Sequence, residues 1–185
     1  VIGDLIERMG KITAQLKRFA RKSPLDLSAV PIGLPISNAL FLIEPRLQKE
    51  GVTLDYDKPA RPSYVFADAN RLEQVLVNLF ANALDAMTHS GLKQLTVMVR
   101  TDIDHATITV GDTGEGISQA AQAHLFEPFF TTKEQGKGLG LGLAISVGIL
   151  REFGGTLKGV NRRGGGAEFI ITLRTAAQED VVETA

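Results

Sequence analysis

A regularly spaced set of five polar side chains lies within a mostly apolar stretch, residues 69–88. The intervals between them are 3, 4, 4 and 3 residues, so a helix would carry all five on one narrow stripe: Arg71, Gln74, Asn78, Asn82 and Asp85. Two asparagines one turn apart can supply neutral oxygen ligands beside a phosphate-bound Mg²⁺, an ion that prefers oxygen and keeps several waters. The plainer alternative is the solvated face of an amphipathic helix.

An acidic, glycine-containing segment follows the strand-like run 106–110. It reads Asp112-Thr113-Gly114-Glu115-Gly116. A carboxylate at a strand end can accept a hydrogen bond from an exocyclic amine such as that of adenine, and glycines let the backbone pass close to a planar base. An acidic β-turn has the same composition, so the segment alone leaves both interpretations open.

A glycine-rich segment, residues 136–143, leads into a predicted helix. Backbone N–H groups at such a turn can hold an anion. The segment is not a P-loop, because Lys137 is followed by Gly138 rather than by Ser or Thr. It is not a dinucleotide fingerprint either, because its glycines alternate and a loop precedes them. It therefore indicates another kind of phosphate loop, or a flexible hinge.

An aromatic run, Phe-Glu-Pro-Phe-Phe-Thr-Thr-Lys at residues 126–133, lies between these two glycine-rich segments. Its aromatic side chains can anchor a loop that folds over a ligand, and Lys133 at its end is free to reach a phosphate. The alternative is an ordinary hydrophobic anchor followed by a solvated lysine.

A mixed scaffold must position these segments. Apolar periodicity and breaker residues predict helices over 1–22, 37–50, 69–89, 118–125 and 138–153, and strands over 52–57, 63–67, 95–101, 106–110, 156–160 and 168–173. Asp68 is placed to cap the helix that follows it. This order predicts an α/β (α+β) two-layer sandwich with helices on one face of a mixed sheet.

The overall composition narrows the classes of partner. A formal net charge of −1 provides no general attraction to nucleic acid or to an anionic membrane. The absence of cysteine excludes disulfides and thiolate metal sites. No apolar run approaches the roughly 20 residues that cross a bilayer. We expect a soluble domain and, because the chain starts at Val1 without an initiator methionine, a piece of a longer protein.

Taken in order, the segments resemble the motifs of the ATP-binding domains of histidine kinases, gyrase-type ATPases, Hsp90-type chaperones and mismatch-repair ATPases. Residues 78–86 resemble the N box, 112–116 the first glycine box, 126–133 the F box, 136–142 the second glycine box and 164–166 the third. The resemblance covers residues 50–174 and implies a Bergerat-type fold that binds ATP and Mg²⁺.

The histidine kinase branch is favoured by Asn78. Hydrolytic members of the superfamily have a glutamate at this position, whereas a carboxamide cannot act as a general base. Residues 129–133 and the doubled Gly-Leu repeat resemble the nitrogen-regulation and dicarboxylate-sensing kinases, and residues 8–23 resemble the end of their second dimerisation helix. The implied organisation is that helix over 1–23, a linker over 24–36, the catalytic domain over 37–174 and a disordered tail over 175–185.

The resemblance also implies roles for individual residues. Asn78, Asn82 and Lys133 would be catalytic, Asn82 would bind Mg²⁺, and Asp112 would hold the adenine amine. The full set implied to bind nucleotide is Asn78, Asn82, Asp85, Asp112, Gly114, Gly116, Ile117, Phe126, Thr131, Thr132, Lys133, Gly138, Leu139, Gly140, Leu141 and Gly142. The third glycine box departs from the family's pattern, because Ala167 replaces a frequent threonine.

The implied reaction transfers the ATP γ-phosphoryl group to a histidine on the protein's own helical dimerisation domain. None of His89, His105 and His124 is followed by the acidic residue that flanks such a histidine, so the acceptor is expected outside this chain. A response regulator and a homodimeric full-length protein are the expected partners, without nucleic acid or direct membrane contact. The expected location is the cytoplasmic side of an inner-membrane sensor. A hydrolytic ATPase and a non-catalytic nucleotide-binding module are the alternatives.

Overall fold

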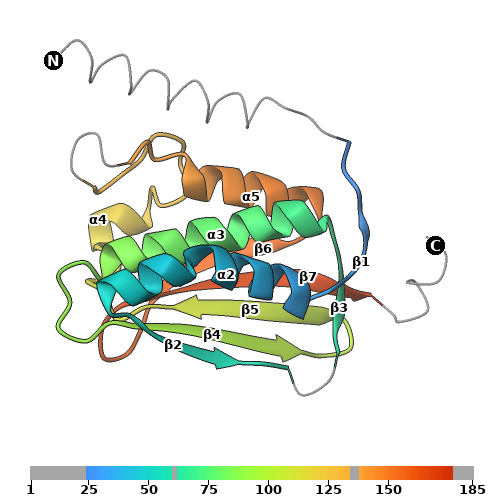
Figure 1. The fold of residues 1–185 in the computed structure, drawn as a ribbon. Helices are drawn as coiled ribbons and strands as arrows, with labels where there is room; N and C mark the ends of the chain where they lie inside the picture. Colours follow the sequence, from blue (N-terminus) through green and yellow to red (C-terminus); the bar gives the residue numbers. More distant parts are fainter. Residues whose placement is uncertain (1–23, 60–61, 134–137, 177–185) are drawn as a thin grey trace, which may run out of the picture.

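A computed structural model describes residues 24–59, 62–133 and 138–176 (Figure 1). Its elements are β1 (Ser28–Pro31), α2 (Gly33–Glu50), β2 (Thr53–Asp57), β3 (Tyr64–Ala67), α3 (Ala69–Ala86), β4 (Gln94–Thr101), β5 (His105–Gly111), α4 (Gln119–Gln122), α5 (Gly142–Glu152), β6 (Thr156–Asn161) and β7 (Ala167–Ala176). The helix predicted over 1–22 lies outside the described residues. No helix in the described part combines the length and apolar content needed to cross a membrane.

The described strands form one seven-stranded sheet. The strand order is β1-β3-β7-β5-β4-β2, and β6 also pairs with β7. The β2–β4 pair is parallel and the others are antiparallel, so the sheet is mixed. Helices α2, α3 and α5 lie over one face of it (Figure 1). The predicted two-layer architecture is confirmed.

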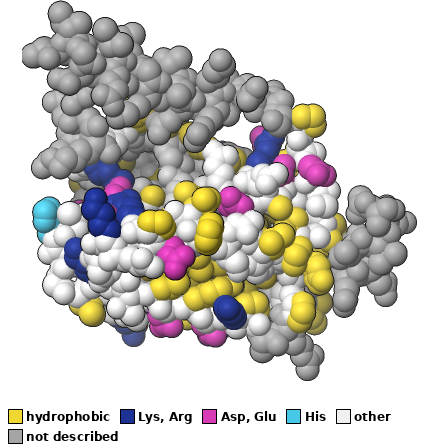
Figure 2. Space-filling view, in the orientation of Figure 1, with side chains coloured by type: hydrophobic (Ala, Val, Ile, Leu, Met, Phe, Trp, Pro, Cys, Tyr) yellow, Lys and Arg dark blue, Asp and Glu magenta, His cyan; other side chains and the backbone are white. Residues whose placement is uncertain are grey.

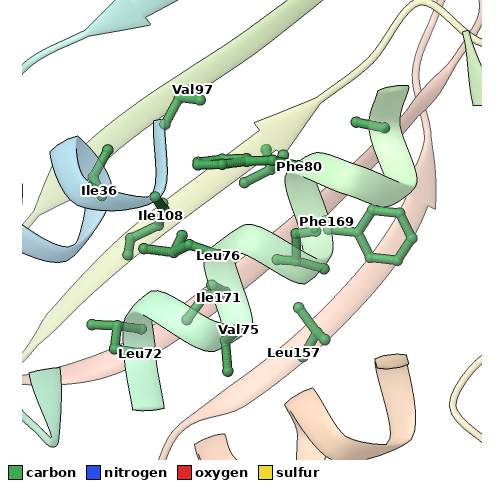
Figure 3. Packing of buried hydrophobic residues seen from close by; sticks show 14 of the residues in the cluster. Ile36, Leu72, Val75, Leu76, Phe80, Val97, Ile108, Leu157, Phe169 and Ile171 are labelled. Atoms are coloured by element: carbon green, nitrogen blue, oxygen red, sulfur yellow. The ribbon is translucent and has the colours of Figure 1, made fainter. Parts of the chain in front are cut away.

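The core lies between this helical layer and the sheet. Alternate residues of β4 and β5 point inward, because successive side chains of a strand face opposite sides. Phe80 and Leu76 of α3 are completely buried on the inner side of the helix, and Ile108 of β5 is completely buried on the inner face of the sheet (Figure 3). This packing fixes α3 on the sheet and thereby orients its opposite, polar stripe.

The N-terminus of α3 is capped as predicted. Asp68 Oδ1 accepts a hydrogen bond from the backbone N–H of Arg71 at 3.1 Å. An oxygen of an N-cap side chain satisfies one of the free N–H groups of the first turn, a contribution of about 1 kcal/mol. The cap fixes where the helix begins.

Helix α2 carries three exposed large apolar side chains on its outer surface. Leu34, Phe41 and Leu42 are 51%, 72% and 58% exposed. Figure 2 shows hydrophobic side chains gathered on this face of the molecule. The opposite side of α2, which includes the fully buried Ile36 and Ala39, packs into the core.

Part of the segment predicted as a linker, residues 24–36, has regular secondary structure instead of the expected loop. Residues 28–31 form β1, which pairs with β3, and α2 begins at Gly33 rather than at 37. Pro31 ends a strand at the edge of the sheet, and Pro35 lies in the first helical turn. A proline in either place removes no required hydrogen bond, so the two prolines did not mark a loop.

Three other predicted boundaries differ from the structure. The helix predicted over 118–125 is the shorter α4, Gln119–Gln122. The helix predicted from residue 138 begins at Gly142, because the preceding glycine-rich residues form a loop. Strand β7 continues to Ala176, so the first two residues of the predicted tail belong to the sheet. Residues 177–185 lie outside the described part.

Candidate nucleotide-binding site

A cavity of about 900 Å³ opens beside α3 and α5. Small-molecule sites commonly have about 300–1,000 Å³, so it can hold a ligand of nucleotide size. Most residues predicted to bind nucleotide line it: Asn78, Asn82, Asp85, Asp112, Gly116, Ile117, Thr131, Thr132, Lys133, Gly138, Leu139, Gly140, Leu141 and Gly142. These predicted residues come from four parts of the sequence that meet around one space, and their contact with a nucleotide stays a prediction.

Two predicted residues do not line the cavity. Gly114 lies against the end of α3, where an added Cβ would come within 2.6 Å of the Ala86 carbonyl oxygen. Phe126 is partly buried and packs against the hydrophobic core. Both positions shape the loops around the cavity from outside it.

Asn78 is fixed at the junction of α3 and α5. Its Nδ2 donates to Ser146 Oγ at 3.1 Å, and Ser146 Oγ donates to the Gly142 carbonyl at 3.0 Å. A Cβ at Gly142 would overlap the Oδ1 atom of Asn78. Glycine is therefore required where the loop enters α5. Ser146 was missed from the sequence, although it is a polar residue one turn after Gly142 in a mostly apolar helix.

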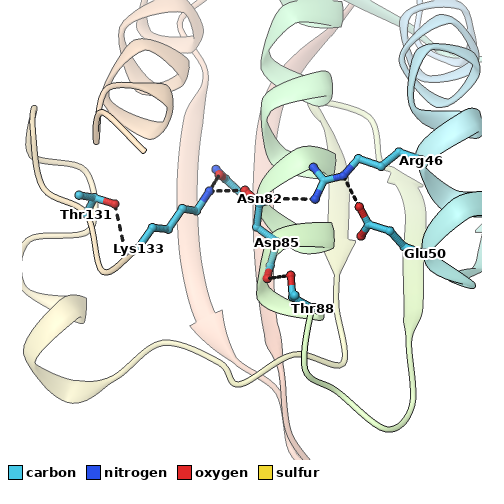
Figure 4. A network of polar contacts seen from close by, with 7 residues as sticks. All are labelled: Arg46, Glu50, Asn82, Asp85, Thr88, Thr131 and Lys133. Atoms are coloured by element: carbon cyan, nitrogen blue, oxygen red, sulfur yellow. Dashed lines mark hydrogen bonds and ion pairs between the residues drawn. The ribbon is translucent and has the colours of Figure 1, made fainter. Parts of the chain in front are cut away.

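Lys133 reaches across the cavity to the polar stripe of α3 (Figure 4). Its Nζ donates to Asn82 Oδ1 at 3.1 Å and to Asp85 Oδ2 at 2.5 Å. The other carboxylate oxygen of Asp85 accepts from Arg46 Nη2 at 2.5 Å, and Arg46 Nε donates to Glu50 at 2.6 Å. A continuous charged network thus joins α2, α3 and the loop that ends at Lys133.

This network controls the charge of Asp85. Partial burial works to raise the pKa of the Asp85 carboxyl, but hydrogen bonds from Lys133 and Arg46 outweigh it and hold that pKa below its usual value. Arg46 was missed from the sequence, because nothing in the pattern of α2 shows that residue 46 faces a carboxylate 39 positions later.

Asp112 presents one carboxylate oxygen to the cavity. The side chain is only 2% exposed, and its Oδ1 accepts from the backbone N–H groups of Gly114 at 2.8 Å and Ala167 at 3.3 Å. Oδ2 of Asp112 accepts no hydrogen bond from the described residues. Every fully buried side-chain oxygen among those residues has a hydrogen-bond partner, so Oδ2 is not fully buried and is accessible from the cavity. Burial raises the pKa of Asp112, and the two hydrogen bonds from backbone N–H groups, which work to lower that pKa, only partly offset it.

The third glycine box closes around the backbone of Asp112. Gly166 has φ +84°, and a Cβ there would overlap the Asp112 carbonyl oxygen. Arg162 Nη1 donates to that same oxygen at 3.1 Å. The turn between β6 and β7 therefore supports the acidic loop directly. Ala167 is buried in the cavity wall and offers no side-chain polar group there.

The fold and the cavity together define a two-layer α/β domain with a cavity of nucleotide size between its polar segments. A family model described as "Histidine kinase-, DNA gyrase B-, and HSP90-like ATPase" matches residues 67–177, and the chain belongs to this family. The predicted superfamily and fold class are confirmed.

The similar proteins are sensor histidine kinases. The C4-dicarboxylate transport sensor protein DctB of Pseudomonas aeruginosa is 42% identical over 90% of this chain, and DctB of Rhizobium meliloti is 37% identical over 95%. The chain covers only 27% and 28% of these two proteins. The predicted dicarboxylate-sensor branch is supported.

Solved structures agree with this assignment. The catalytic domain of histidine kinase ThkA has a TM-score of 0.73 and 27% identity, with 82% of this chain and 99% of that chain covered. Full-length ShkA, crystallised with AMPPNP, has a TM-score of 0.75 and 28% identity, with 95% of this chain and 37% of that chain covered.

Proposed function

We propose that this domain binds Mg²⁺–ATP and transfers the γ-phosphoryl group to a histidine on a separate helical dimerisation domain. The observation that carries the proposal is the identity and setting of Asn78. Its amide is bound to Ser146 and packed against Gly142. The motif resemblance places the glutamate of the hydrolytic ATPases at this same position. A carboxamide cannot take a proton from water, so Asn78 does not activate water as the nucleophile, and transfer to a histidine is favoured over hydrolysis.

The base end of the nucleotide is assigned to Asp112. Its accessible Oδ2 can accept a hydrogen bond from an exocyclic amine. Apolar side chains beside it, among them Ile117, Ala167 and Phe169, can cover the faces of a planar base. The phosphates are assigned to residues 138–142, where backbone N–H groups meet the N-terminus of α5.

The residues present fit a magnesium ion that arrives with the nucleotide. Asn82 Oδ1 and the Asp85 carboxylate are hard oxygen donors on one side of the cavity. The described residues contain no cluster of three or more His, Cys, Asp or Glu that could hold a metal by itself. Mg²⁺ bound through phosphates needs only one or two protein ligands, and when bound it supplies positive charge at the phosphates.

Phosphoryl transfer requires mainly positioning and charge neutralisation from the protein. In this proposal Asp112 orients the base, while the α5 N-terminus and Lys133 neutralise the phosphates. An imidazole of the acceptor domain supplies the attacking nitrogen. Asn78 is not a general base, so it does not activate water at the phosphate end of the cavity.

The wider setting is proposed from the relatives. ThkA has been crystallised in complex with the response regulator TrrA, so we propose that a response regulator receives the phosphoryl group here too. The similarity to the C4-dicarboxylate transport sensor DctB supports a dicarboxylate signal. We also propose that the full-length protein is a homodimeric, membrane-anchored sensor with this domain on its cytoplasmic side.

The test follows labelled γ-phosphate from Mg²⁺–ATP, with this chain alone and with a separately made histidine-bearing helical domain of a related kinase. Acid-labile label on the helical domain, lost in Asp112→Ala and Asn82→Ala, is the expected result. Rapid release of free phosphate by the chain alone would instead establish a hydrolytic ATPase. Tight ATP binding with no transfer to several acceptor domains would indicate a non-catalytic module.

A further inference from the structure

The Lys133 ammonium lies directly on the oxygens assigned to the metal. It donates to Asn82 Oδ1 at 3.1 Å and to Asp85 Oδ2 at 2.5 Å (Figure 4). The two acceptors are one turn apart on α3, and Lys133 comes from a loop 51 residues beyond Asn82. The positively charged ammonium group of Lys133 therefore already occupies the polar end of this cavity.

Two cations cannot share this position. A divalent ion on Asn82 Oδ1 would lie within a few ångströms of the Lys133 ammonium, and like charges at that separation repel strongly in a partly buried site. We propose that Lys133 is a tethered cation that occupies the magnesium position in the nucleotide-free domain, and that Mg²⁺ entering with ATP displaces it toward the phosphates. This inference rests on the function proposed above.

The network around Asp85 allows the exchange. Asp85 Oδ1 is bound to Arg46, which is itself held by Glu50. When Lys133 leaves, Asp85 keeps a charged partner and α2 stays joined to α3. Lys133 reaches Asp85 through a flexible four-carbon side chain that is 33% exposed. Moving its ammonium requires a change of side-chain conformation and no rearrangement of the core.

The exchange has a thermodynamic consequence. Ligands that compete for one position weaken each other's binding, and the coupling is reciprocal. In the wild type, Lys133 partly substitutes for Mg²⁺ when ATP binds without metal, and it opposes Mg²⁺ when metal is present. Mg²⁺ therefore strengthens ATP binding by a smaller factor in the wild type than in a domain without the Lys133 ammonium.

The main experiment measures the Kd of ATP by calorimetry in EDTA and in saturating Mg²⁺. The Kd in EDTA is divided by the Kd in Mg²⁺, so a larger ratio means that Mg²⁺ strengthens ATP binding more. Lys133→Met is expected to raise this ratio about tenfold over the wild type, within the usual range of site coupling. Arg46→Met is the control for general loss of positive charge, because Arg46 is equally close to Asp85 but does not bind Asn82. It is expected to raise the ratio less than threefold. Thermal melting confirms that each variant is folded.

A second measurement follows the metal position directly. The side-chain amide signal of Asn82 is recorded by NMR as Mg²⁺ is added to the domain saturated with metal-free ATP. It should move at a lower Mg²⁺ concentration in Lys133→Met than in the wild type. An equal response in both proteins, or an equal rise of the Kd ratio in Lys133→Met and Arg46→Met, would overturn the proposal. A wild type that binds no ATP would instead refute the proposed function itself.

Discussion

The side-chain amide of Asn161 binds both backbone polar groups of Ile117. Asn161 Oδ1 accepts from Ile117 N at 2.6 Å, and Asn161 Nδ2 donates to Ile117 O at 2.8 Å. Asn161 is the last residue of β6, and Ile117 follows the acidic loop and lines the cavity. One side chain thus attaches the wall beside Asp112 to the sheet.

Removing this attachment should loosen the base end of the cavity. Two hydrogen bonds of about 1 kcal/mol each set an upper limit of about 30-fold on the loss of ATP affinity in Asn161→Ala. Arg163→Ala, in the exposed turn that follows β6, is the matched control and should bind ATP normally. Titration with a fluorescent ATP analogue measures both. An unchanged Kd in Asn161→Ala would show that the wall keeps its position without the amide.

Two glycines of α5 should respond oppositely to the same substitution. Gly142→Ala would drive a Cβ into Asn78 Oδ1, so we expect weaker ATP binding and a loss of stability of about 1–3 kcal/mol. A Cβ at Gly148 meets nothing within 4 Å, so Gly148→Ala should stabilise the domain by about 0.5–1 kcal/mol with normal ATP binding. Urea unfolding and ATP titration measure the pair. Equal effects would mean that the contact with Asn78 is not what requires glycine.

The accessible oxygen of Asp112 should discriminate between purines. Hydrogen bonds to charged groups contribute about 1.5–3 kcal/mol, so purine riboside triphosphate, which lacks the exocyclic amine, should bind the wild type about 10- to 150-fold more weakly than ATP. In Asp112→Asn this difference should largely disappear, because the amide can present a donor instead of an acceptor. Competition titrations test both nucleotides. Retained discrimination in the variant would assign the amine to another group.

The network around Asp85 should make stability depend on pH in acid. The folded-state pKa of Asp85 is lowered from 3.8, so its carboxylate stabilises the fold above that pH and the contribution is lost as pH falls through the folded value. Asp85→Asn should therefore be less stable than the wild type at pH 7, with a gap that narrows below about pH 4. Urea unfolding across this range measures the gap. A gap independent of pH would mean that Lys133 and Arg46 do not favour the charged form.

Local patterns were sufficient for the elements that have strong local signals. The spacing of polar residues and the Asp68 cap located α3, and the left-handed Gly51 ended α2 as predicted. The first strand was missed because its stability comes from pairing with β3, more than thirty residues later. The start of α2 was missed because Pro35 suits either a loop or a first helical turn, and only the packing of Ile36 against the core decides between them.

The sequence by itself determined which chemical groups are available: the amides of Asn78 and Asn82, the carboxylate of Asp112 and the glycines around them. Their types and short-range spacing are properties of the chain that no packing can change. Only the tertiary structure decided which groups meet: Arg46 with Asp85, Asn161 with Ile117 and Lys133 with Asn82, across 39, 44 and 51 residues. Such pairs depend on sheet register and on how the helices lie over the sheet, which are set by burial of the whole core rather than by any local run of residues.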